Sequence, residues 1–311
     1  MKFHRLFFGR NMKEYDIKIG EIVFRFCTEK TLEIEPELIP FLIEGKANPE
    51  VKILVRWDYE MAEEPKTPMA GQDLIQNYYI EETVRFCETK GGKKGPVALV
   101  VYSERCDELQ CFINGSVYQQ RYYSLGWILR LLPMREIFQR FGVIFFHAAQ
   151  IALGDQGILF TAPSETGKST QASLWEEHEM ARILCGDRTL VREIEKQWRG
   201  YGYPVDGSSP VRSTETTKLC AVVLLEQAKE NRIEKLKGIK GAAHLMPQLV
   251  IDGWSVEARQ RGIELLLALQ GEVPFYRLFC TPDKKAVEVL KRQLIEDGMI
   301  EDGKNQGTLI E

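Results

Sequence analysis

Cysteine pairs, surplus positive charge and long apolar runs are all missing from this chain. Its seven cysteines are scattered and none forms a Cys-x-x-Cys pair, so neither a zinc site nor a disulfide framework is indicated. The net charge is −4, which argues against a nucleic-acid-binding surface. No stretch is long enough to span a membrane. We expect reduced thiols, a cytoplasmic location, and partners that include neither nucleic acid nor a membrane.

The start of the chain and its length point the same way. The apolar run 6–8 in MKFHRLFFGR is too short for a signal peptide. The 311 residues, of which 44% are hydrophobic, suffice for two modest domains or one large one with a sizeable core. The sequence does not fix the oligomeric state, and a homo-oligomer is compatible with it.

The first 123 residues are predicted to be mostly antiparallel β-structure. Apolar and polar residues alternate over 15–19 and again over 22–26, on either side of Gly20-Glu21, which predicts a hairpin. Further strands are expected at 51–57, 79–87, 97–102 and 109–113. No catalytic constellation stands out here, so we interpret residues 1–123 as a structural or recognition domain.

The apolar period becomes helical between residues 124 and 140. Apolar side chains recur at helical spacing, and Pro133 should kink or split the run. We expect one or two helices that connect the N-terminal domain to a second domain over residues 141–298, followed by a flexible tail over 299–311.

The most informative stretch is Ile158–Thr170, which reads ILFTAPSETGKST. A short apolar strand, a loop closing on Gly-Lys-Ser-Thr and a following helix have the layout of a phosphate-binding P-loop. Lys168 can then reach the outer phosphates, and the Ser169 hydroxyl can bind Mg²⁺. Ala162 stands where the usual pattern has its first glycine, and this is tolerated only if the position does not need a positive φ. A surface turn that happens to contain GKS is the weaker alternative.

Two features around the loop add detail. Residues 141–153 form a strand-like run, and the short turn 154–157 predicts an antiparallel hairpin into the loop, whereas the strand before an ordinary P-loop lies in a parallel sheet. The strand predicted at 181–185 ends at Asp187, which suits either a metal-binding acid or a turn cap; beside a P-loop we favour the metal role.

The remaining C-terminal region completes an α/β (α+β) domain. We expect a rigid loop rather than a strand over 198–209, a fully buried strand over 219–225 and another strand over 275–280. The predicted helices are 170–180, 242–249, 256–270 and 284–295.

Together these residues resemble a known group. The order His147, strand, turn, strand, APSETGKST and then LCGDR resembles the C-terminal domain of HPr kinase/phosphorylase and the related core of ATP-dependent phosphoenolpyruvate carboxykinase. The segments YGYPVDG and VPFYRLFCTPD resemble HPr-kinase-like proteins of peptide-modification pathways. The resemblance covers about residues 141–295 and implies a P-loop domain with a mixed sheet.

The resemblance also implies roles for individual residues. Asp187 falls on the first acid of the family's Asp-Asp pair, and His147 on the histidine that interacts with that pair. Ser169 and Asp187 would hold Mg²⁺, and Lys168 would neutralise the transferred phosphate. The triphosphate of ATP would be held by Pro163, Ser164, Glu165, Thr166, Gly167, Lys168, Ser169 and Thr170.

Arg188 departs from the family pattern, because it occupies the position of the second acid. Asp187 could serve alone as base or as metal ligand, and Arg188 could stabilise charge in the transition state. Alternatively, catalysis is lost and nucleotide binding remains.

We therefore expect an ATP- and Mg²⁺-dependent kinase that phosphorylates a hydroxyl on a peptide, a protein or a small molecule, with Asp187, His147, Lys168 and Arg188 as candidate catalytic residues. The alternative is a nucleotide-binding regulatory or scaffold protein. A carboxykinase is a weaker third hypothesis, because arginines for the substrate carboxylates cannot be placed.

Overall fold

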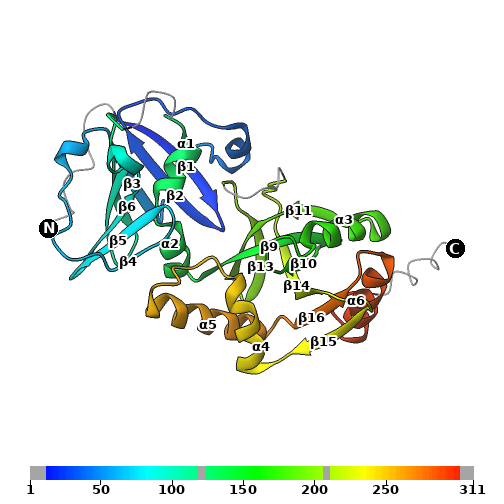
Figure 1. Cartoon of the computed structure of the whole chain (residues 1–311). Helices are drawn as coiled ribbons and strands as arrows, with labels where there is room; N and C mark the ends of the chain where they lie inside the picture. The colour runs from blue at the N-terminus through cyan, green and yellow to red at the C-terminus, as the bar shows by residue number, and fades with distance from the viewer. Residues whose placement is uncertain (1–11, 118–122, 206–210, 302–311) are drawn as a thin grey trace. The chain divides into compact units, whose positions relative to one another are not determined.

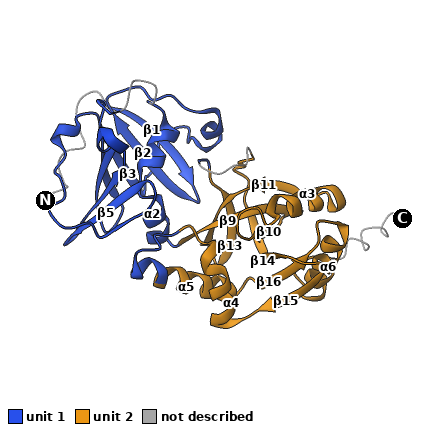
Figure 2. Cartoon of the chain, in the orientation of Figure 1, with its two compact units in different colours: residues 1–142, 204–206, 251–259 blue, residues 143–203, 207–250, 260–311 orange. Residues whose placement is uncertain are grey.

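The chain folds into two compact units. The computed structural model describes residues 12–117, 123–205 and 211–301. Unit 1 comprises residues 1–142, 204–206 and 251–259, and unit 2 comprises 143–203, 207–250 and 260–311 (Figure 2). Figure 1 labels many of the helices and strands of both units. The mixed helix and strand content confirms the expected α+β class.

Unit 1 is built on one sheet with the strand order β1-β2-β3-β8-β7-β6-β5-β4. Its central part is parallel, because β2, β3 and β8 run in the same direction, and the remaining pairs are antiparallel. The elements are β1 (Lys13–Ile19), β2 (Ile22–Thr28), η2 (Pro36–Phe41), β3 (Val51–Arg56), η3 (Tyr59–Met61), β4 (Gly71–Gln72), β5 (Gln76–Glu81), β6 (Val84–Thr89), η4 (Gly92–Lys94), β7 (Ala98–Ser103), β8 (Glu108–Ile113), α1 (Leu125–Leu131) and α2 (Met134–Arg140).

The sequence-based strands of unit 1 are mostly confirmed. The hairpin β1–β2 forms as expected, with Ile19 paired to Ile22. The single strand predicted at 79–87 is wrong: the chain turns at Glu82, which adopts φ 50°, and divides the segment between β5 and β6. The turn contains neither glycine nor proline, so the sequence did not reveal it.

The helical segment before residue 140 is split as predicted. Ser124 caps α1 by accepting a hydrogen bond from the Trp127 amide. Pro133 lies between α1 and α2, both of which belong to unit 1. A late segment, 251–259, also belongs to unit 1, where Asp252 pairs with Arg135 of α2 at 3.3 Å. No local pattern in the sequence indicated that return of the chain.

Unit 2 is built on a mixed sheet with helices on both faces (Figure 1). Its elements are β9 (Val143–Leu153), β10 (Gln156–Thr161), α3 (Lys168–Glu179), β11 (Arg182–Cys185), β12 (Arg188–Ile194), β13 (Gln197–Gly202), β14 (Thr217–Gln227), β15 (Arg232–Leu236), α4 (Gly238–Leu245), η5 (Met246–Gln248), α5 (Val256–Gln270), β16 (Phe275–Cys280) and α6 (Lys284–Glu296). Residues 256–259 of α5 belong to unit 1.

The strand that enters the loop, β10, has two different neighbours. It pairs antiparallel with β9 through the turn at Gly154, which confirms the predicted hairpin. On its other side it pairs parallel with β14. Because β12 and β13 complete the path from β9 to β14, the pairings close into a ring. This ring holds β9, β10 and β12 together at the end of the sheet from which the loop leaves.

The segment 198–209 was predicted to be a loop, and its first part is a strand instead. Residues 197–202 form β13, paired with β12 and β14; residues 206–210 lie outside the described part. The glycines that suggested a loop instead allow other parts of the chain to approach the strand closely. A Cβ on Gly200 would lie 2.6 Å from the Gln150 amide nitrogen, and a Cβ on Gly202 would lie 2.5 Å from the Ser213 carbonyl oxygen.

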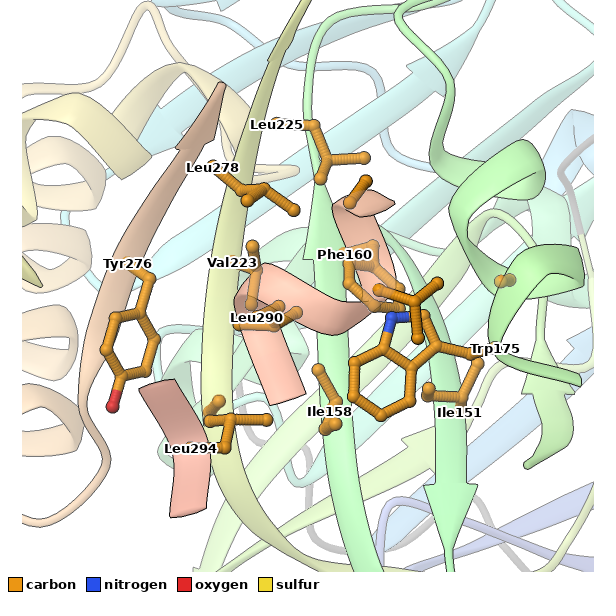
Figure 3. Close-up of a cluster of buried hydrophobic side chains, with 14 of the residues drawn as sticks. Ile151, Ile158, Phe160, Trp175, Val223, Leu225, Tyr276, Leu278, Leu290 and Leu294 are labelled. Atoms are coloured by element: carbon orange, nitrogen blue, oxygen red, sulfur yellow. The ribbon is translucent and has the colours of Figure 1, made fainter. Parts of the chain in front are cut away.

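The core of unit 2 has two apolar layers, one on each face of β14. Val223 and Leu225 pack toward α3 and α6 in one cluster, whereas Val222 and Leu224 pack toward α4 and α5 in the other. Figure 3 shows the first cluster, in which Trp175 of α3 lies beside Phe160 of β10. Burial of both faces explains why residues 219–225 are continuously apolar and confirms that prediction.

Candidate functional site

The loop between β10 and α3 has a backbone that suits a phosphate-binding turn. Gly167 immediately precedes the helix and adopts φ 112°, and Glu165 adopts φ 63°. Ala162 is fully buried and is not among the residues with positive φ. The replacement of the usual first glycine by alanine is therefore tolerated by this backbone. The residues of the loop with left-handed backbone geometry are Glu165 and Gly167, three and five residues after Ala162.

Lys168 is held against the loop. Its ammonium donates hydrogen bonds to the carbonyl oxygens of Ala162 at 3.0 Å and Pro163 at 3.3 Å. The side chain is buried, and burial lowers the pKa of Lys168, while the Asp187 carboxylate acts in the opposite direction. Within the described part of the chain, this buried ammonium donates hydrogen bonds to main-chain carbonyls, and an incoming anion would stabilise it further.

The first turn of α3 offers backbone donors to such an anion. Because the helix begins at Lys168, the amides of Lys168, Ser169 and Thr170 have no helical carbonyl ahead of them. The side chains of Ser169 and Thr170 are exposed, as are those of Pro163, Ser164 and Glu165, whereas Thr166 and Gly167 are half-buried. All eight candidate phosphate-binding residues thus lie on one continuous loop and helix start.

A histidine–aspartate pair lies next to Lys168. His147 Nε2 is 2.7 Å from Asp187 Oδ1. The pair is positioned by the sheet, because Ala148 donates its amide hydrogen to the Asp187 carbonyl at 3.0 Å and Arg188 is the cross-strand partner of His147. Thr161, the last residue of β10, donates its hydroxyl hydrogen to the His147 carbonyl at 2.8 Å, which ties the pair to the start of the loop.

The charges around His147 favour its neutral form. Burial lowers the pKa of His147 below its usual 6.5, the Lys168 ammonium lowers it further, and Asp187 opposes both. A carboxylate can only accept hydrogen bonds, so neutral His147 carries its proton on Nε2 and donates it to Asp187. The histidine therefore fixes the orientation of the carboxylate without adding a charge.

Arg188 begins β12 and extends beside Asp187. Its Nε lies 3.9 Å from Asp187 Oδ2, and its guanidinium carbon lies 5.8 Å from the centre of the Phe145 ring. Phe145 packs edge-on against Tyr203 at 4.8 Å. Sequence reasoning missed Phe145 as part of the site. The available signal was that Phe145 lies two residues before His147 on one strand and so shares its face.

The residues present fit a magnesium ion bound together with a nucleotide. Within the described ranges, no group of three or more His, Cys, Asp or Glu side chains could hold a metal ion by itself. Mg²⁺ usually keeps several waters and takes only one or two protein oxygens, with phosphates supplying the rest. The Ser169 hydroxyl and the Asp187 carboxylate are the oxygens available near Lys168.

Two further histidines lie near the ends of helices, and Arg212 pairs with the strand that precedes Asp187. His178 is on the last turn of α3 and His244 on the last turn of α4. Arg212 forms a β-bridge with Cys185, two residues before Asp187. The structure thus brings His147, Lys168, Asp187 and Arg188 together from three separate segments.

The fold and the site define an α+β protein in which an antiparallel hairpin leads into a candidate phosphate-binding loop. A family model described as SynChlorMet cassette protein ScmC matches residues 109–294, which is more than half of the chain, and the chain belongs to this family.

Comparison with solved structures finds the Hpr(Ser) kinase/phosphatase from Coxiella burnetii at 13% identity, covering 50% of this chain and 89% of that chain, with a TM-score of 0.29. A TM-score this low supports no conclusion about activity. None of the curated proteins matches the chain. Among the described residues, no helix is both long and apolar enough to cross a membrane.

Proposed function

We propose that the protein is an ATP- and Mg²⁺-dependent phosphotransferase that phosphorylates a hydroxyl group. The observation that carries this proposal is the 2.7 Å contact between His147 and Asp187 beside the buried Lys168. A P-loop lysine next to an oriented carboxylate provides both phosphate neutralisation and a proton acceptor, which are the two protein contributions that phosphoryl transfer to an alcohol needs.

ATP is the co-substrate that the loop suits best. The unpaired amides at the start of α3 and the positive end of the helix favour a polyphosphate. Lys168 would exchange its contacts with the Ala162 and Pro163 carbonyls for the β- and γ-phosphates. The Ser169 hydroxyl would hold Mg²⁺ together with phosphate oxygens and water, which leaves Asp187 to act as the base, and the ion would neutralise charge on the phosphate oxygens.

The transfer step assigns a task to each side chain. The acceptor oxygen forms a bond to the γ-phosphorus, the bond from that phosphorus to the β,γ-bridging oxygen breaks, and ADP leaves. The acceptor proton passes to Asp187, whose orientation His147 maintains. Lys168 balances the charge of the transferred group. Phosphoryl transfer depends mainly on such positioning and charge neutralisation, so a single acid at this position is sufficient.

The acceptor is a hydroxyl of a peptide, a protein or a small molecule, and we propose a cytoplasmic setting. The seven free and buried cysteines suit a reducing compartment. Fold and loop geometry alone do not identify an acceptor.

One observation favours a second candidate, a nucleotide-binding regulatory protein without transfer. Arg188 stands beside Asp187 at 3.9 Å, where a second acid would strengthen metal binding. If Arg188 competes with Mg²⁺ for Asp187, ATP binds but is not consumed. The two candidates therefore differ in turnover and agree in nucleotide binding.

The decisive experiment measures binding and turnover on the same protein. ATP affinity is measured by calorimetry, and ADP formation and the mass gain of candidate acceptors are followed with Mg²⁺ present. We expect Lys168→Ala to abolish nucleotide binding and Asp187→Asn to retain binding while transfer falls by about 100-fold or more. Lys218→Ala, on the exposed side of β14, is the matched control.

The outcomes separate the candidates. Intact ATP affinity in Lys168→Ala refutes the P-loop assignment. Binding without ADP formation for any acceptor establishes the regulatory alternative. Unchanged transfer in Asp187→Asn shows that this carboxylate is neither base nor essential metal ligand.

A further inference from the structure

A hollow in unit 1 lies where parallel strands of the sheet end. β2 and β3 run in the same direction, so the residues that follow them meet at one edge, which is where α/β sheets commonly bind ligands. The hollow has a volume of about 390 Å³, within the range of about 300–1,000 Å³ that is usual for small-molecule sites. Its lining includes Glu29 after β2, Leu54 within β3, and Arg56, Trp57 and Asp58 at the end of β3.

An aromatic pair beside this hollow already holds an ammonium group. The ring centres of Trp57 and Tyr123 are 4.5 Å apart, with their planes at 71°. The Lys30 ammonium lies 4.4 Å from the centre of each ring, well inside the distance at which an aromatic face attracts a cation. The Trp57 indole is fixed by the hydrogen bond that its Nε1 donates to the Thr28 hydroxyl at 3.1 Å. The pair is therefore a formed cation site, and Trp57 also lines the hollow.

Lys30 is a replaceable occupant of the aromatic pair. It is exposed, and among the described residues its ammonium has one hydrogen bond, which it donates to the Tyr123 hydroxyl at 3.2 Å. Attraction between a cation and a ring is weak at an exposed position, and the lysine stem is flexible. Lys30 can thus turn into solvent when another cation takes its place.

The charges that line the hollow leave one carboxylate unneutralised. Arg56 and Asp58 neutralise each other through two hydrogen bonds, from Nε to Oδ1 at 2.9 Å and from Nη2 to Oδ2 at 2.5 Å. Glu29 is exposed and, within the described part of the chain, forms no hydrogen bond or ion pair; it acts on Arg56 through its charge alone. The lining therefore carries one net negative charge, which disfavours an anionic ligand and favours a cation.

We propose that the hollow binds an alkylammonium group, the chemistry that a lysine side chain and a small diamine share. The ligand ammonium replaces Lys30 over Trp57 and Tyr123. Glu29 pairs with the ligand, and the methylene stem of the ligand packs along Leu54. Lys30 forms no ion pair with its neighbour Glu29 within the described residues, so the ligand gains an interaction that Lys30 lacks. This inference gives unit 1 a binding function and does not depend on phosphotransfer.

Calorimetry on the full-length protein without nucleotide tests the site with three probes. Nα-acetyl-lysine methylamide presents a side-chain ammonium, the corresponding norleucine derivative has a similar stem without the charge, and 1,5-diaminopentane is the diamine. We expect the ammonium probes to bind at least about 10-fold more tightly than the norleucine derivative, and less tightly at high salt. Tighter binding of the capped lysine identifies a peptide as the source of the ligand, and tighter binding of the diamine identifies a small molecule.

Substitutions at the site should change the affinity for the capped lysine in opposite directions. Lys30→Ala removes the competing ammonium and should tighten binding by about 3- to 10-fold, because the aromatic pair is then always available. Glu29→Gln should weaken binding by about 10-fold. Trp57→Phe should keep part of the affinity, and Trp57→Leu should lose it. Lys52→Ala and Glu60→Gln, at exposed positions of the same unit, are the matched controls and should leave the affinity unchanged.

Three results would overturn the inference. Equal affinities for the lysine and norleucine probes would show that the hollow does not select a cation. Unchanged or weaker binding in Lys30→Ala would show that Lys30 does not compete for the aromatic pair. Absence of binding by both ammonium probes, in the wild type and in Lys30→Ala, would exclude the site. Lys30→Ala and Glu29→Gln alter exposed side chains, so both variants remain decisive even if Trp57→Leu does not fold.

Discussion

Two substitutions in the loop between β10 and α3 are expected to change stability in opposite directions. Gly167 adopts φ 112°, and a Cβ there would meet nothing within 4 Å. Gly167→Ala therefore introduces backbone strain without a steric clash. Glu165 adopts φ 63°, so it already carries the strain of a left-handed conformation, which Glu165→Gly relieves.

The magnitudes follow from two opposing contributions. A side chain in this region costs about 1–3 kcal/mol in the folded state. Replacing glycine stiffens the unfolded chain and returns about 0.4–1 kcal/mol, and introducing glycine does the reverse. We expect Gly167→Ala to lower the free energy of unfolding by about 1–2 kcal/mol. Glu165→Gly should raise it by about 0.5–1 kcal/mol.

Urea unfolding with a fitted midpoint and slope measures both changes. Gly154→Ala, at φ 63° in the β9–β10 turn with the same open space around its Cβ, is the control. Gly167→Ala should also weaken ATP binding, because the loop amides turn away, whereas Gly154→Ala should lose stability and retain affinity. Equal unfolding free energies for Gly167→Ala and wild type would refute the reasoning, since the loop would not need this backbone conformation.

Three further outcomes are expected. His147→Ala loses the contact with Asp187 and should lower kcat by about 10- to 100-fold. His147→Gln keeps an N–H donor for Asp187 and should retain more transfer activity. Equal rates in the two variants would argue against an orienting role, and His178→Gln is the control. Burial raises the pKa of Glu136 above 4.5, so its contribution to stability is present at low pH and is lost as the pH rises through the raised pKa. Urea titrations at several pH values should therefore show a smaller decline of the unfolding free energy with rising pH in Glu136→Gln than in wild type. Trp175→Ala, which empties a fully buried position against Phe160, should lower the free energy of unfolding by about 3–5 kcal/mol in the same assay, and a loss below 1 kcal/mol would contradict the packing in Figure 3.

The local pattern of the sequence was sufficient for the loop and its flanks. A short apolar run followed by Gly-Lys-Ser-Thr predicted a strand, a loop and a helix, and these are β10, the turn around Gly167 and α3. The short turn at Gly154 predicted the hairpin from β9. These features depend on residues close together in sequence, so propensity and spacing determine them. The prediction of a single strand at 79–87 was wrong, because one residue with left-handed backbone geometry, Glu82, is enough to turn the chain.

Only the tertiary structure decided which distant residues meet. His147 and Asp187 are 40 positions apart, and their contact depends on the register between β9 and β12, which no local pattern encodes. The same register sets Arg188 over Phe145. The glycines of β13 suggested a loop in the sequence, whereas the structure shows that they leave room for Gln150 and Ser213. The sequence by itself therefore determined where the candidate phosphate-binding loop lies, and long-range strand pairing decided which side chains surround it.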